Sequence, residues 1–139
     1  MPNIQNSQAL ISIFGEWPSF HDAEVTSLVL SRQCGNGASL EATIHLWQTT
    51  NEIDFEGYFV KQNHILAVLL FDDIVLDLLK DFNHQNALLE LSIRELDAAV
   101  SGNDGCQFEV VFQAAYGCHA LFKCQSISVV SAEHCTPPI

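Results

Sequence analysis

After Glu24, several segments carry apolar residues at every second position, and clusters of turn-forming residues separate these segments. In the segment 39–48 the apolar set is Leu40, Ala42, Ile44 and Leu46, and the intervening set is Glu41, Thr43, His45 and Trp47. Such alternation places successive side chains on opposite faces of an extended chain. A strand of this kind buries one face only, which limits the fold to antiparallel sheets joined by short turns.

Periodicity and turn signals divide the chain into a series of expected strands. We predict strands at 24–32, 39–48, 64–71, 87–96, 106–115 and 119–130, a polar loop at 49–57, and turns at Gly35-Asn36-Gly37, Ser101–Gly105 and Tyr116-Gly117. Segment 64–71 is apolar at odd and even positions alike, which indicates the central strand. The apolar residues of segment 72–82 fit one stripe of a helix as well as the alternation of a strand. Both a helix and a strand or loose turn are therefore possible there, and we favour the strand or loose turn.

The N-terminal segment differs from the rest because Leu10 and Phe14 have helical spacing. We predict a short helix that Asn6 or Ser7 caps and that Gly15 ends. Strands do not alternate with further helices, which argues against a parallel, doubly wound sheet and its nucleotide-binding crevice. The predicted fold is α+β and mainly β: one antiparallel meander sheet of about six or seven strands, strongly curved or barrel-like, with a short N-terminal helix.

Composition indicates the size of the fold and excludes some partners. The 139 residues suit a single domain spanning 1–139, and 48% apolar against 16% charged residues suffice to fill a core. Five Lys and Arg against 17 Asp and Glu leave a formal net charge of −12, which repels nucleic acids and anionic lipid headgroups. No segment approaches the roughly 20 apolar residues of a membrane span, and the first residues lack a basic leader. We therefore expect a cytoplasmic protein with no nucleic-acid or membrane partner.

The cysteines and histidines give no sign of a metal site. The five cysteines are odd in number and form no CxxC pair, so we expect reduced thiols. The histidines are scattered singly and form neither HxxxH nor HExxH. Cys118 lies beside His119, but adjacent strand residues point to opposite faces and cannot share a proton. We expect no metal and no cofactor.

The densest group of functional side chains directly precedes the first predicted strand. His21, Asp22 and Glu24 are residue types that serve acid/base chemistry or bind a divalent metal ion. They converge only if the chain turns sharply at Asp22, because on an extended backbone His21 points away from the other two. The favoured alternative is structural: Trp17 and Phe20 close the end of the core, while His21 or Asp22 binds backbone groups of the turn.

Carboxylates also gather in the middle of the sequence. Most charge of this kind only keeps a protein solvated. A concentrated negative field beside exposed aromatic side chains would in addition attract and anchor a basic protein. We therefore predict a protein-binding surface made of Asp54, Phe55, Glu56, Asp72, Asp73, Asp77 and Trp47.

Four strings spread along the chain carry a resemblance to a known family: FGEWPSFHDAEV at 14–25, IHLW at 44–47, FNHQN at 82–86 and GCHALFKC at 117–124. In these strings the chain resembles immunity protein family fifty of the bacterial polymorphic toxin systems, and related uncharacterised small bacterial domains. The resemblance implies a cytoplasmic protein that binds and blocks a toxin, with no turnover of its own. It implies no catalytic residue.

Three hypotheses follow from the residues and the resemblance together. The favoured one is an acidic immunity protein that binds and neutralises a basic partner such as a toxin domain. The second is a small metal-dependent or acid/base enzyme that uses His21, Asp22 and Glu24. The third is a homo-oligomeric structural domain, for instance a homodimer, in which a sheet face or a strand edge pairs with its own copy.

Overall fold

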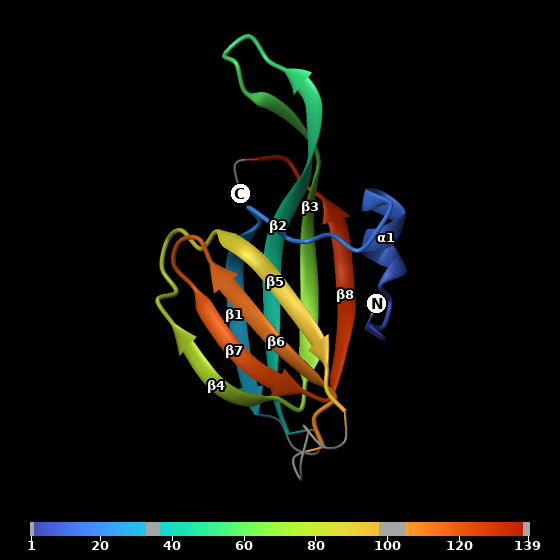
Figure 1. Cartoon of the computed structure of the whole chain (residues 1–139), viewed down its shortest axis with the longest axis vertical. Helices are drawn as coiled ribbons and strands as arrows, with labels where there is room; N and C mark the ends of the chain where they lie inside the picture. Colours follow the sequence, from blue (N-terminus) through green and yellow to red (C-terminus); the bar gives the residue numbers. More distant parts are fainter. Residues whose placement is uncertain (1, 33–36, 98–104, 138–139) are drawn as a thin grey trace.

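The structure, a computed structural model, describes residues 2–32, 37–97 and 105–137. Within these residues it has one helix and eight strands, in the order α1 (Gln8–Phe14), β1 (Glu24–Arg32), β2 (Ala38–Ile53), β3 (Phe59–Asp72), β4 (Val75–Lys80), β5 (Leu88–Glu95), β6 (Phe108–Ala114), β7 (His119–Cys124) and β8 (Ser126–His134). The first sheet has the order β1-β2-β3-β8 and the second β4-β7-β6-β5. All neighbouring strands are antiparallel, and the two sheets pack as a sandwich (Figure 1).

The prediction of a single meander sheet of six or seven strands is wrong, and in the described part of the chain neither sheet closes into a barrel. After β3 ends at Asp72, Asp73 adopts a left-handed conformation (φ 52°) and the chain enters the second sheet at Val75. Gln125 alone separates β7 from β8, so the strand predicted over 119–130 is divided between the two sheets. The N–H of Gln125 donates to the Asp72 carbonyl at 3.0 Å, which ties the two crossings together.

Side chains that alternate toward the space between the sheets build the core, as the period-two pattern predicts. In β2 and β3 the fully buried set is Leu40, Ala42, Ile44, Ile65, Ala67, Leu69 and Phe71. Phe71 of the first sheet meets Phe112 and Phe122 of the second edge to face, with ring centroids 6.0 and 5.0 Å away. These aromatic contacts join the two sheets because edge-to-face rings add attraction to the burial of apolar surface.

Helix α1 confirms the predicted N-terminal helix. It ends at Gly15, whose left-handed conformation (φ 84°) lets its N–H donate to the Ile11 carbonyl at 2.8 Å. Ser7 occupies the N-cap position without a side-chain capping bond. Asn6 instead donates from Nδ2 to the Val129 carbonyl at 2.9 Å, which holds the helix beside β8 (Figure 1). Among the described residues no helix is long and apolar enough to cross a membrane.

Other predicted elements also have clear outcomes. Segment 64–71 lies in β3, an interior strand of the first sheet, as predicted, and segment 72–82 contains the strand β4 rather than a helix. Gly117 in the β6–β7 turn has φ 78°, and a Cβ there would collide with Gln85 and Asn86, so only glycine fits. The other two predicted turns lie largely outside the described residues.

β2 and β3 continue beyond the sandwich as a two-stranded projection, which we call the arm and which comprises residues 47–63 (Figure 1). The polar loop predicted over 49–57 is therefore wrong for 49–53, which belong to β2. Backbone pairing such as that of Ile53 with Phe59 does not need a buried face, so polar residues extend the hairpin into solvent.

A β-bulge marks the root of the arm. Asn63 and His64 together face Trp47, because β2 advances by two residues between paired positions while β3 advances by three. Asn63 accommodates the bulge with a positive φ of 51°. Bulges bend a strand and increase its twist, so this one directs the arm away from the sheet.

Candidate functional site

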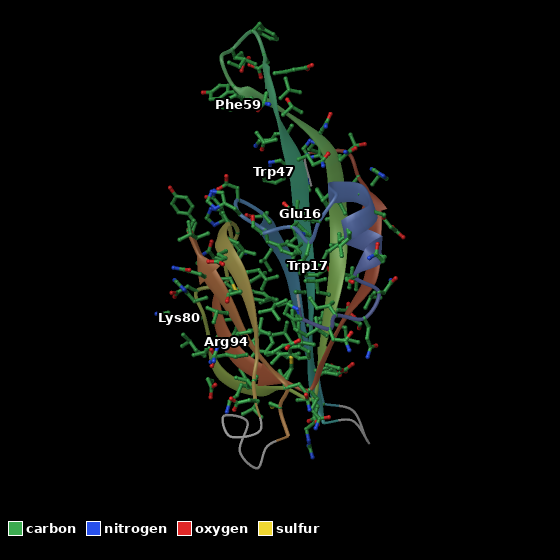
Figure 2. All side chains as sticks on the ribbon, turned by 45° about the vertical axis from the view of Figure 1, so that its right-hand side comes forward. Glu16, Trp17, Trp47, Phe59, Lys80 and Arg94 are labelled. Atoms are coloured by element: carbon green, nitrogen blue, oxygen red, sulfur yellow. The ribbon has the colours of Figure 1, made fainter. Side chains whose placement is uncertain are left out.

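The tip of the arm displays large apolar side chains. Ile53, Phe55, Tyr58 and Phe59 are 62%, 98%, 69% and 56% exposed. Figure 2 shows Phe59 on the projecting arm, far from the sandwich. A single exposed apolar residue is ordinary, but several on one short turn form the kind of patch that marks an interaction site. Phe55 was predicted here, and it is the most exposed of them.

Asp54 builds the turn at the tip of the arm. Its Oδ1 accepts hydrogen bonds from the N–H groups of Glu56, at 2.9 Å, and Tyr58, at 3.0 Å. The Asp54 N–H donates to the Tyr58 carbonyl at 2.8 Å, and the Gly57 N–H donates to the Asp54 carbonyl at 3.1 Å. These short-range bonds hold the turn in one shape while Phe55 stays exposed.

The arm is acidic as well as aromatic. Its tip carries the three carboxylates of Glu52, Asp54 and Glu56. Lys61 is the one basic residue among 47–63, all of which the structure describes. Its Nζ lies 4.5 Å from the centroid of the Trp47 ring at the root. The tip therefore presents negative charge with no neutralising lysine or arginine of its own.

Four side chains pack at the root of the arm, and we call them the root cluster: His45, Trp47, Lys61 and His64. Nε2 of His45 and Nδ1 of His64 are 3.0 Å apart, and the His45 and Trp47 ring centroids are 5.0 Å apart. Burial lowers the pKa of His45, and His64 and Lys61 lower it further. Trp47 is half-buried, although the sequence predicted an exposed anchor (Figure 2).

The remaining carboxylates of the predicted surface lie away from the arm, around the crossing from β3 to β4. Asp72 ends the 14-residue strand that Phe59 begins, and a strand of this length spans roughly 40 Å. Asp73 follows at the crossing, and Asp77 is exposed on β4. The structure therefore divides the predicted surface between the arm tip, with Asp54, Phe55 and Glu56, and a distant β3–β4 acidic group of Asp72, Asp73 and Asp77.

The segment between α1 and β1 crosses the end of the sandwich that lies nearest the arm (Figures 1 and 2). Phe20 is only 2% exposed and its ring centroid lies 5.6 Å from that of the half-buried Trp17. Both rings pack against the core, where the structural interpretation of the sequence put them. Phe20 and Asp22 have φ values of 62° and 67°, so the chain does turn sharply at Asp22.

That turn does not bring the three candidate catalytic side chains together. Nδ1 of His21 donates to the Leu89 carbonyl at 2.8 Å, and its Nε2 lies 3.6 Å from the exposed Asp22 carboxylate. Oε1 of Glu24 instead accepts from the Asn86 N–H at 2.9 Å. Across the described residues, no three His, Cys, Asp or Glu side chains are arranged to hold a metal ion. The contacts of His21 and Glu24 tie this segment to neighbouring backbone.

Asn86 is a buried polar residue to which the sequence pattern assigned no role. Its Oδ1 accepts from the N–H groups of Asn83 and Cys118, at 2.9 and 3.2 Å. Its Nδ2 donates to the carbonyls of Asn83 and Val25, at 2.7 and 3.3 Å. One amide thus joins β1 of the first sheet to the start of β7 in the second. The only signal in the sequence was its place in the string FNHQN.

Cys118, Cys124 and Cys135 are free thiols. Burial, helped by the charge of Asp81, raises the pKa of Cys118 to about 11. Burial also raises the pKa of Cys124 to about 12, with smaller contributions from Cys106 and Asp72. Because the thiolate is the reactive form, Cys118 and Cys124 are poor nucleophiles at neutral pH.

Comparisons with known proteins identify the family. Neither the curated proteins nor the solved structures include a significant match to the chain. The family model described as Immunity protein 50 matches residues 6–134, a range that contains α1, every described strand and the arm. This match confirms the predicted family. The chain therefore belongs to the Immunity protein 50 family.

Proposed function

We propose that this protein neutralises a bacterial toxin by binding it directly, and that the toxin is basic. Family membership supports an immunity role in general. One structural observation carries the proposal further: three carboxylates and three aromatic side chains are exposed together on a projecting arm. An acidic inhibitor associates quickly with a cationic active site and suppresses wrong partners by charge.

The proposed action is occlusion of the toxin, which requires neither a cofactor nor turnover. The contact residues that we propose are Asp54, Phe55 and Glu56 at the arm tip. Asp72, Asp73 and Asp77 of the β3–β4 acidic group add to the negative field that attracts the toxin. We also propose that the protein acts in the cytoplasm, and the free thiols of Cys118, Cys124 and Cys135 support a reducing compartment. The net charge of −12 disfavours a nucleic-acid or anionic-membrane partner.

The test uses the C-terminal domain of the toxin encoded by the gene adjacent to that of this protein. We expect calorimetry to give an equimolar complex with a nanomolar Kd, and the purified protein to abolish the toxin activity at equal concentration. The affinity should fall as NaCl is raised, because complementary charges are screened. Lysozyme, a basic protein, serves as a control for unspecific attraction. Absence of a complex, or a complex that leaves the toxin active, contradicts the proposed function.

A further inference from the structure

We propose that the arm is the docking element and that its tip inserts into a cationic cleft of the toxin, an inference that rests on the proposed function. Two paired strands are about 5 Å apart, so the arm is narrow enough to enter a cleft that a sheet face cannot. Its tip lies roughly 40 Å along β3 from the β3–β4 acidic group, as the 14 residues of that strand require. A single compact toxin domain held at the arm tip therefore leaves that second acidic group uncovered.

The arm keeps its shape without a partner. At the tip, Asp54 accepts two backbone N–H bonds. Midway, Thr50 Oγ1 donates to the Val60 carbonyl at 2.8 Å and accepts from the Glu52 N–H at 3.2 Å. At the root, the ring contacts of Trp47 and the histidine pair hold the bulge. A preorganised element loses little conformational entropy on binding, which favours affinity.

The aromatic side chains at the tip contribute nothing to the core, whose residues all lie in the sandwich or in the segments around α1. Phe55, Tyr58 and Phe59 leave apolar surface in water, which is unfavourable for the isolated chain. Burial in a partner reverses that cost, and aromatic side chains are the commonest anchors of protein interfaces. The tip therefore has the chemistry of an interface centre rather than of a solvated loop.

The charge pattern selects the kind of cleft. Glu52, Asp54 and Glu56 flank the aromatic side chains, and the only basic residue of the arm, Lys61, lies over Trp47 at the root. The complementary site has lysine or arginine at its rim and apolar surface at its floor. A cleft that holds a phosphate backbone has such a rim. An anionic membrane would instead repel the tip, and a second copy of the chain would bring like charges together.

Two triple variants that remove equal charge separate docking from general attraction. The tip variant is Glu52→Gln with Asp54→Asn and Glu56→Gln, and the control variant is Asp72→Asn with Asp73→Asn and Asp77→Asn. Asn at position 54 keeps an Oδ1 acceptor for the turn. Surface plasmon resonance on the immobilised toxin domain should show a dissociation rate at least about tenfold faster for the tip variant. The control variant should change only the association rate, by less than about threefold.

Single substitutions test the aromatic anchors. Phe55→Ala and Tyr58→Ala should each weaken the Kd for the toxin domain by about thirtyfold or more, as substitution of an interface anchor does. Tyr116→Ala is the matched control, because Tyr116 is 64% exposed and lies outside the arm. It should change the Kd by less than about threefold. Circular dichroism and the urea midpoint of these three single variants should match the wild type, because none of the three side chains is in the core.

The outcomes separate this inference from the function on which it rests. If wild type does not bind the toxin domain, the proposed function fails. If wild type binds tightly and the tip variants bind equally well, docking by the arm is overturned while the function stands. Two further outcomes overturn docking by the arm. In one, the wild-type protein alone sediments as a dimer and the Phe55→Ala variant sediments as a monomer. In the other, the wild-type protein sediments with anionic lipid vesicles and the Phe55→Ala variant does not.

Discussion

At the scale of single residues, Asn86 connects the two sheets. It is 2% exposed, yet both atoms of its amide have two hydrogen-bond partners each. Its own N–H donates to Glu24, so the carboxylate that looked catalytic in the sequence serves this junction. A buried amide is tolerated because every polar group around it is paired, and removing it leaves those groups unpaired in the interior.

We expect Asn86→Ala to lower the free energy of unfolding by about 2–4 kcal/mol, because it strands the Cys118 N–H and the Val25 carbonyl in the interior. Asn86→Asp should cost a similar amount, since a carboxylate cannot donate to the two carbonyls. Urea denaturation followed by circular dichroism measures both. Asn51→Ala, on the exposed arm, is the control and should stay within about 0.5 kcal/mol of wild type. A loss as small as this for Asn86→Ala would contradict the junction role.

At the scale of elements, the arm depends on a root that contains a hydrogen-bonded pair of histidines. Nε2 of His45 and Nδ1 of His64 are within hydrogen-bond distance, which requires one of them to donate and the other to accept. The Lys61 ammonium contributes to the lowered pKa of His45, and Glu24 is the cross-strand partner of His45. The Glu24 carboxylate is engaged with Asn86. Double protonation of the pair would break its hydrogen bond.

The lowered pKa of His45 predicts a pH dependence of stability. The unfolded chain binds this proton more readily than the folded protein, so the contribution is complete above the ordinary pKa of 6.5 and is lost as the pH falls below it. We expect His45→Gln to lose less stability than wild type between about pH 7.5 and about pH 5.5 in urea denaturation. His84→Gln, in an exposed loop, should keep the wild-type difference. Equal differences for both variants and wild type would exclude His45 as the cause.

At the scale of the whole molecule, acidic residues outnumber basic ones, 17 against five, around a core that both sheets share. Of the five basic residues, Arg94 pairs with Glu109 at 3.0 Å and Lys61 lies over Trp47. With a net charge of −12, the excess carboxylates repel one another more strongly in the compact folded state than in the expanded unfolded state. The same field that would attract a basic toxin opposes folding of the isolated protein.

We expect NaCl to stabilise the protein alone while it weakens the proposed toxin complex. Raising NaCl from about 0.01 M to about 1 M shortens the screening length from about 30 Å to about 3 Å. The thermal midpoint should rise by a few degrees, which corresponds to about 1 kcal/mol for a chain of this size. Differential scanning calorimetry measures it, and the tip variant defined above should show a smaller rise. A midpoint that falls with NaCl would show that favourable ion pairs outweigh self-repulsion.

The candidate site was predictable only in part. Composition predicted an acidic surface with exposed aromatic side chains, and Asp54, Phe55 and Glu56 do lie together at the arm tip. The separation of Asp72 from this tip was not predictable, because it depends on β3 running unbroken between them. The half-buried position of Trp47 depends likewise on a bulge that neither strand signals alone.

The sequence by itself determined most of the strands, the interior position of β3 and the short helix, because these follow from local periodicity and turn residues. Only the tertiary structure decided that the strands divide between two sheets at Asp73 and Gln125, and that polar residues continue β2 and β3 into an arm. The buried positions are even-numbered in β7 and odd-numbered in β8. A period of two indicates which face of a strand is buried, but it does not indicate which strand pairs with it. Pairing partners lie far apart in the chain, so their choice is made by the packing of the whole molecule.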